Sequence, residues 1–82
     1  MSNEVTVRNY ILENYLFTDD QSALSNDSSL LDEGILDSTG ILELVVFLED
    51  EFGIKVDDHE MVPENLDSVN SILKYISNKS SQ

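Results

Sequence analysis

The segment from Asp37 to Gly53 has the local features of one complete amphipathic helix. Asp37 is a preferred N-cap residue, and Gly53 is a preferred residue just beyond a helix C-terminus. Between them, apolar residues recur at three- and four-residue spacings, which places them along one helix face. These residues are Ile41, Leu44, Val45, Leu48 and Phe52. The sequence therefore predicts a helix that runs through Phe52 and packs this stripe into a core.

Two other segments have helical periodicity. The first runs from about Asn3 to Phe17, and the last begins near Asp67 or Ser68, either of which can cap it. Their apolar faces comprise Val7, Ile11, Leu12, Tyr15 and Leu16 in the first, and Val69, Ile72, Leu73 and Ile76 in the last. A short helical turn over Asp57 to Val62 is expected to end at Pro63. Since nothing alternates with a period of two, the predicted fold is all-α: a small four-helix bundle of three main helices and one short helix.

A polar loop from Thr18 to Leu36 separates the first two main helices. Loops of this length without secondary structure of their own are uncommon in small domains and are often functional. Its apolar residues are expected to hold it against the core: Leu24, Leu30, Leu31, Ile35 and Leu36. We expect residues 1–82 to form a single domain, structured from about residue 3 to 77, with a polar tail at 78–82.

The net charge of the chain limits the classes of molecule that it can bind. Seventeen acidic residues against 4 basic ones give a formal net charge of −13. Such a surface repels nucleic-acid phosphates and anionic membranes, and it attracts basic patches on other proteins. The chain has no cysteine, no secretory pattern at its N-terminus and no apolar run near membrane-spanning length. We therefore expect a monomeric, cytoplasmic protein with basic protein partners, which neither binds nucleic acid nor inserts into membranes.

The segment Leu30-Leu31-Asp32-Glu33-Gly34-Ile35-Leu36-Asp37-Ser38 is the most unusual part of the sequence. It places Ser38 in the first turn of the central helix, directly after the cap and at the end of the long loop. Backbone N–H groups there lack partners within the helix, and the helix dipole makes the position mildly positive. The position therefore suits a phosphate attached to the serine, although Asp and Ser are also ordinary helix-start residues.

This segment resembles the acyl carrier protein family. The resemblance covers nearly the whole chain and is strongest in LLDEGILDSTGILELVVFLEDEFGIKV, residues 30–56, and LDSVNSILKYI, residues 66–76. It implies that a phosphopantetheinyl transferase modifies Ser38, whose hydroxyl attacks the pyrophosphate of coenzyme A. The resulting 4′-phosphopantetheine arm would carry acyl or aminoacyl groups as thioesters. Partner enzymes would supply the catalytic groups, so the chain itself is not expected to be an enzyme.

The resemblance also implies that the second helix is the main docking surface for partner enzymes. Residues assigned to this surface are Asp37, Thr39, Leu42, Glu43, Val46, Glu49 and Asp50. Thr39 stands where the family usually has leucine, and Gly40 where fatty-acid carriers often have an acidic residue. These differences disfavour a fatty-acid synthesis carrier, whose partners are acyltransferases and synthases. The Gly-Ile-Leu-Asp-Ser pattern, residues 34–38, is more similar to stand-alone carriers that serve AMP-forming ligases, including D-alanyl and other aminoacyl carriers.

Two interpretations from other classes stay open at this point. The chain could be an acidic helical module that binds a basic protein without a prosthetic group, in which case its function would survive Ser38→Ala. It could also be a small metal-dependent hydrolase that uses the acidic cluster around His59, the sole histidine. An exposed helix start explains His59 better than a metal site does, so we expect no metal.

Overall fold

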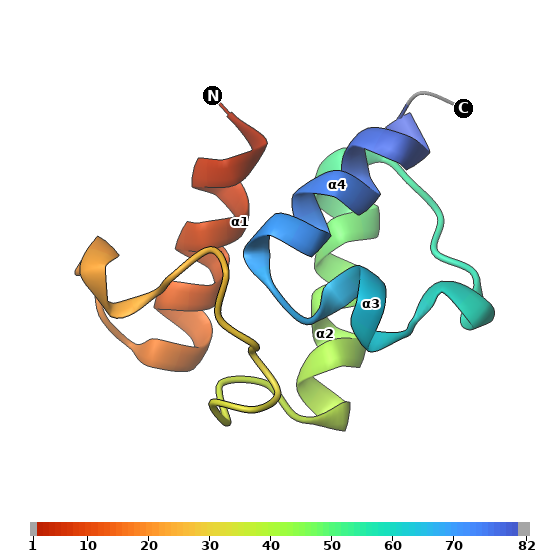
Figure 1. Cartoon of the computed structure of the whole chain (residues 1–82). Helices are drawn as coiled ribbons and strands as arrows, with labels where there is room; N and C mark the ends of the chain where they lie inside the picture. Colours follow the sequence, from red (N-terminus) through yellow and green to blue (C-terminus); the bar gives the residue numbers. More distant parts are fainter. Residues whose placement is uncertain (1, 81–82) are drawn as a thin grey trace.

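The computed structural model describes residues 2–80, and the described chain is all-helical. Its α-helices are α1 (Asn3–Ile11), α2 (Ser38–Phe52), α3 (Pro63–Leu66) and α4 (Val69–Ser80). A π-helical turn, Leu12–Leu16, extends α1, and short 3-10 turns occur at Gln21–Ala23 and Asp58–Glu60. Figure 1 shows α1, α2 and α4 as the three main helices, with short α3 before α4. The predicted fold class and helix count are confirmed.

One hydrophobic cluster joins α1, α2, α4 and the long loop. Its members are Val7, Ile11, Leu12, Leu24, Leu30, Leu36, Leu44, Val45, Leu48, Val56, Leu66, Val69, Ile72, Tyr75 and Ile76. The apolar stripe predicted for α2 is confirmed for Leu44, Val45 and Leu48, which are almost fully buried. Ile41 and Phe52, predicted as core residues, are only half-buried. They occupy the first and last turns of α2, where fewer elements cover the helix.

Both ends of α2 form as their local signals predict. The Asp37 carboxylate accepts a hydrogen bond of 2.8 Å from the backbone N–H of Gly40, which is the N-cap arrangement. At the other end, Gly53 adopts the left-handed conformation with φ 65°, and its N–H donates to the Glu49 carbonyl at 3.0 Å. These two local devices set the length of the helix that presents Ser38.

The end of the first helix differs from a regular α-helix. After Ile11 the chain forms a π-helical turn, and it then leaves the helix at Phe17, whose φ is 54°. Phe17 is 83% exposed. Since the left-handed region is unfavourable for residues with a side chain, Phe17 adopts a costly conformation without gaining burial.

The segment around Pro63 also differs from the prediction. The turn expected over Asp57 to Val62 is shorter, Asp58–Glu60, and it ends before Pro63 is reached. Pro63, expected to stop a helical turn, begins helix α3 instead. Proline suits the first position of a helix because the N–H that it lacks has no helical acceptor there.

Helix α4 begins with Ser68 as its cap, since the Ser68 hydroxyl accepts from the N–H of Ser71 at 3.1 Å. It continues through Ser80, so residues 78–80, expected as part of a polar tail, are helical instead. Residues 81–82 of that tail lie outside the described residues. Lys79 explains the continuation, because it forms an ion pair of 2.9 Å with Glu60 and so ties the last turn to the fold.

None of the helices in residues 2–80 is long and apolar enough to span a membrane.

The long loop is held against the helices at both of its ends. Near its start, Arg8 of α1 donates to the Gln21 carbonyl at 2.6 Å and to the Asn26 side chain. Near its end, the N–H of Leu30 donates to the Asp67 carbonyl at 2.6 Å. Of its apolar residues, Leu24, Leu30 and Leu36 are buried, as predicted, while Leu31 and Ile35 are half-buried. The loop therefore delivers the chain to the start of α2 along a defined path.

Candidate functional site

Ser38 is the first residue of α2, and it is exposed. Its hydroxyl makes no hydrogen bond to any of residues 2–80, and neither does its backbone N–H or that of Thr39. Asp37 caps the helix through the N–H of Gly40, so it leaves the two preceding N–H groups available. Free N–H groups and the helix dipole favour a negative group at this position. The hydroxyl is thus accessible for modification, next to donors that suit a phosphate.

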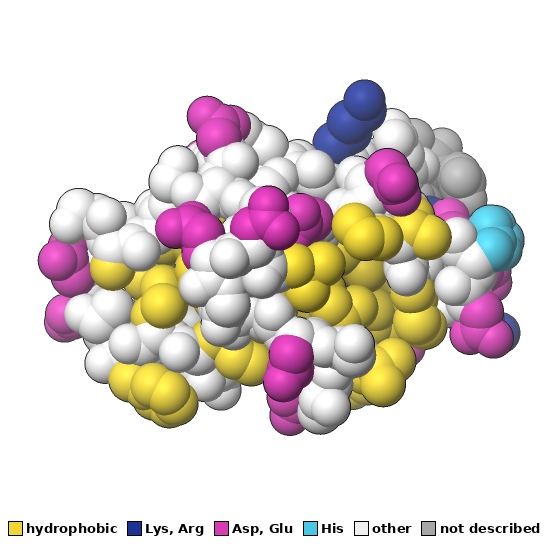
Figure 2. All heavy atoms as spheres, turned by 60° about the horizontal axis from the view of Figure 1, so that its bottom comes forward, with side chains coloured by type: hydrophobic (Ala, Val, Ile, Leu, Met, Phe, Trp, Pro, Cys, Tyr) yellow, Lys and Arg dark blue, Asp and Glu magenta, His cyan; other side chains and the backbone are white. Residues whose placement is uncertain are grey.

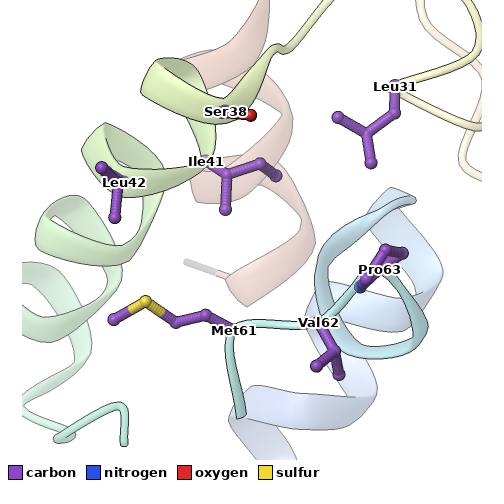
Figure 3. Close-up of a pocket in the computed structure, with 7 residues that line it drawn as sticks. All are labelled: Leu31, Ser38, Ile41, Leu42, Met61, Val62 and Pro63. Carbon is purple, nitrogen blue, oxygen red and sulfur yellow. The ribbon is translucent and has the colours of Figure 1, made fainter. Parts of the chain in front are cut away.

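An apolar hollow of about 380 Å³ lies next to Ser38. It is lined by Leu31, Ser38, Ile41, Leu42, Met61, Val62 and Pro63. Figure 3 shows that these side chains surround one space. They come from the end of the long loop, from the first turns of α2 and from the segment that enters α3. The half-buried position of Ile41 is explained here, since this side chain packs against the core on one side and forms part of the wall of the hollow on the other.

The outer face of α2 combines apolar and acidic side chains. Leu42 and Val46 are 55% and 56% exposed, one turn apart on the helix. Thr39, Glu43 and Asp50 are exposed on the same helix. Figure 2 shows hydrophobic surface bordered by acidic side chains on the side of the molecule that includes the lower end of Figure 1. Such a surface suits a partner whose own patch is basic at its rim and apolar at its centre.

Glu49 differs from the other acidic residues that were predicted to contact partners. It is half-buried, and its carboxylate accepts a hydrogen bond of 2.9 Å from the N–H of Val56. One of its oxygens therefore holds the segment after α2 in place. Its predicted contact with partners stays a prediction, and the structure adds a role in folding.

Several residues that shape the site were not identified from the sequence. Met61, Val62 and Pro63 form one wall of the hollow, although they lie more than twenty residues after Ser38. Asp67, considered above only as a helix cap, accepts from the Ser29 hydroxyl at 2.6 Å and from the N–H of Leu31 at 2.9 Å. No local pattern could have indicated these contacts, because each depends on how α3 meets the loop.

The acidic cluster around His59 has an explanation within the fold. Ligand atoms of Asp57, His59 and Glu60 lie within 4.8 Å of one another. However, Glu60 accepts from Lys79 at 2.9 Å and from the Tyr75 hydroxyl and the Asp57 N–H at 3.1 Å each. The pKa of Glu60 is lowered to about 2, mainly by the hydrogen bond from Lys79 and next by the hydrogen bond from the Asp57 N–H. An ion pair and a capping box therefore account for this carboxylate.

The chain is similar to known carriers over most of its length. The family described as "Phosphopantetheine attachment site" matches residues 11–76. A D-alanyl carrier protein of Streptococcus uberis is 40% identical over 85% of this chain and 90% of its own. A D-alanyl carrier protein of Streptococcus suis is 40% identical over 89% of each chain. An acyl carrier protein of Thermotoga maritima is 37% identical over 73% of this chain and 72% of its own.

The family match covers the helix that begins at Ser38, the long loop before it and the hollow beside it. It agrees with the geometry of an exposed serine beside free N–H groups and an apolar hollow. It also agrees with the resemblance noted from the sequence, and it identifies 4′-phosphopantetheine as the prosthetic group. This chain belongs to the phosphopantetheine-binding family of carrier proteins.

Proposed function

We propose that this protein carries aminoacyl groups, with D-alanine as the first candidate, as thioesters on 4′-phosphopantetheine attached to Ser38. The observation that carries the proposal is the placement of Ser38: its exposed hydroxyl has no partner in residues 2–80, and it stands at a helix N-terminus beside an apolar hollow. The D-alanyl carrier proteins, which match more of the chain than the acyl carrier protein does, support the choice of cargo.

The residues around Ser38 fit the prosthetic group. The free N–H groups of Ser38 and Thr39 can donate hydrogen bonds to its phosphate oxygens, and the hollow offers apolar surface next to the attachment point. When bound, the group supplies the thiol on which cargo is held as a thioester. The rigid first turn of α2, capped by Asp37, sets the direction in which the arm leaves the protein.

Attachment requires one bond to form and one to break. The Ser38 oxygen bonds to the phosphorus of coenzyme A that bears pantetheine, and adenosine 3′,5′-bisphosphate leaves. The hydroxyl proton passes to a base of the transferase. Ser38 itself therefore contributes only the acceptor oxygen.

We propose two partner enzymes for the α2 surface: a phosphopantetheinyl transferase and an AMP-forming aminoacyl ligase. Both would meet exposed Leu42 and Val46 at the centre and Glu43 and Asp50 at the rim. Exposed ion pairs contribute only about 0–1 kcal/mol each, so docking through such a rim is readily reversible. Reversible docking suits a protein that must leave one enzyme for the next.

Intact-protein mass spectrometry tests the attachment site. The purified chain is incubated with coenzyme A and a broad-specificity phosphopantetheinyl transferase, with Ser38→Ala and the exposed-serine control Ser80→Ala in parallel. We expect one phosphopantetheine to be added to the unmodified chain and to the control, and none to Ser38→Ala. Loading of Ser38→Ala would show that the site is wrong, and no loading of any variant would refute the carrier function.

A second experiment tests the cargo. The loaded protein is offered to a D-alanine-activating ligase with ATP and D-alanine, and separately to a fatty-acid-activating ligase with ATP and fatty acids. We expect an aminoacyl thioester in the first reaction. A product only in the second would replace the aminoacyl role by that of a fatty-acyl carrier.

A further inference from the structure

The Tyr15 side chain connects the first helix to the outer face of α2. Its hydroxyl donates a hydrogen bond of 3.1 Å to Oε1 of Glu43, and the Tyr10 hydroxyl lies 3.4 Å away. Glu43 is exposed and lies one turn after Gly40 on the surface assigned to partner enzymes. Tyr15, which lies outside α2, thus holds the carboxylate of Glu43, which belongs to α2.

Aromatic packing fixes the position of Tyr15. Its ring meets the Tyr10 ring edge to face, with centroids 5.8 Å apart, and Tyr10 stacks on Phe47 of α2 at 4.0 Å. Tyr15 itself belongs to the π-helical turn, which changes the direction in which side chains leave the helix. The tyrosine is therefore anchored to α2 through a neighbour on α1.

Gly40 lies beside this ring and packs most tightly against Leu36. A Cβ atom placed on Gly40 would lie 3.5 Å from Cε1 of Tyr15 and 3.1 Å from a methyl group of Leu36. A glycine in the first turn of a helix costs stability relative to alanine. Here the missing Cβ relieves a tight contact with Leu36, while the Tyr15 ring lies at ordinary contact distance from the turn that contains Ser38.

The contact orders Glu43 and leaves part of its carboxylate accessible. Tyr15 uses Oε1, and no hydrogen bond from residues 2–80 reaches Oε2. Burial, aided by the hydrogen bonds to Tyr10 and Glu43, raises the pKa of Tyr15 well above its ordinary value of 10.0. The hydroxyl consequently remains a donor at neutral and alkaline pH.

We propose that Tyr15 is a positioning residue for enzyme docking, which orients the Glu43 carboxylate toward a basic side chain of the phosphopantetheinyl transferase or ligase. The proposal rests on the proposed carrier function. A side chain that is already ordered loses less rotamer freedom when a partner binds it, so the ion pair forms at a lower entropic cost. Tyr15 would then act on docking, through Glu43, and not on the chemistry at Ser38.

Steady-state kinetics of loading by the transferase test this role. The variants are Tyr15→Phe, Glu43→Gln and the double variant, each measured in salt on the order of 0.05 M and 0.5 M. Tyr75→Phe is the matched control, because the Tyr75 hydroxyl also donates to a glutamate, Glu60, at 3.1 Å. Melting temperatures are recorded, so that every assay is made on folded protein.

We expect Tyr15→Phe to raise KM about 2- to 10-fold with kcat unchanged, the range that corresponds to ordering one side chain. Its KM should remain salt-sensitive, because the Glu43 charge is still present. Glu43→Gln should raise KM and reduce its salt dependence, and the double variant should match Glu43→Gln alone, since Tyr15 acts through Glu43. Tyr75→Phe should leave both constants unchanged.

Different results overturn the two proposals separately. If the unmodified chain is loaded but Tyr15→Phe has the KM of Tyr75→Phe, the positioning role is wrong and the carrier function stands. Additive effects in the double variant, or a fall in kcat alone, would equally contradict positioning through Glu43. If the unmodified chain is never loaded, the carrier function fails and the docking role fails with it.

Discussion

Asp67 is predicted to be a major anchor of the long loop that leads to Ser38. Its carboxylate accepts from the Ser29 hydroxyl at 2.6 Å and from the N–H of Leu31 at 2.9 Å. Asp67→Ala removes both acceptors at a half-buried position. A hydrogen bond to a charged group contributes about 1.5–3 kcal/mol. In the variant, water will hydrogen-bond to the two freed donors and so recover part of this energy. We therefore expect the free energy of unfolding to fall by about 2–4 kcal/mol.

Urea unfolding followed by circular dichroism measures this loss. A change of 1 kcal/mol shifts the melting temperature of a domain of this size by about 4–8 °C, so the variant should melt at least about 8 °C lower. Asp67→Asn keeps an acceptor for the Leu31 N–H, and we expect it to lose about half as much. The loading rate of Asp67→Ala should also fall, because Leu31 lines the hollow beside Ser38.

The matched control is Asp32→Ala in the same loop. Asp32 is exposed, its carboxylate bonds to none of residues 2–80, and its removal changes the net charge by the same amount. If Asp67→Ala and Asp32→Ala differ by less than about 0.5 kcal/mol, the size of an ordinary surface effect, Asp67 does not anchor the loop. Hydrogen exchange of the Leu31 amide gives an independent check, since only Asp67→Ala should accelerate it.

Substitutions at three other positions have defined outcomes. Asp37→Ala removes the cap on the Gly40 N–H and should lower the unfolding free energy by about 1 kcal/mol in urea; an unchanged value would mean that the cap is dispensable. Phe17→Gly should raise the unfolding free energy by about 1 kcal/mol, because glycine adopts a φ of 54° without strain. Phe17→Ala should not raise it, and equal effects of the two substitutions would exclude backbone strain as the cause. Because the Lys79 contact lowers the folded pKa of Glu60 from 4.5 to about 2, the stability that it adds is complete above pH 4.5 and is lost as the pH falls toward 2. The stability difference between the unmodified chain and Glu60→Gln should therefore shrink from pH 6 to pH 3 in urea titrations; a constant difference would contradict the assignment.

The helix that carries Ser38 could be predicted from the sequence because its signals are local. The cap at Asp37, the stop at Gly53 and the apolar spacing between them act within one or two turns. The free N–H groups at its first turn are predictable for the same reason, since any helix that starts at Ser38 leaves them without helical acceptors. Fold class and helix count followed from patterns of this kind, whereas the prosthetic group was implied by the resemblance to the acyl carrier protein family.

Tertiary packing decided the features that join distant parts of the chain. The hollow beside Ser38 needs Leu31 and Met61, which come from separate segments, and Asp67 reaches the loop only because α3 lies against it. Tyr15 reaches Glu43 through a π-helical turn and a stack of aromatic rings. Short-range sequence patterns carry the preferences of adjacent residues for helix, cap or turn. Which side chains then meet depends on how whole helices pack, and that is a property of the folded core.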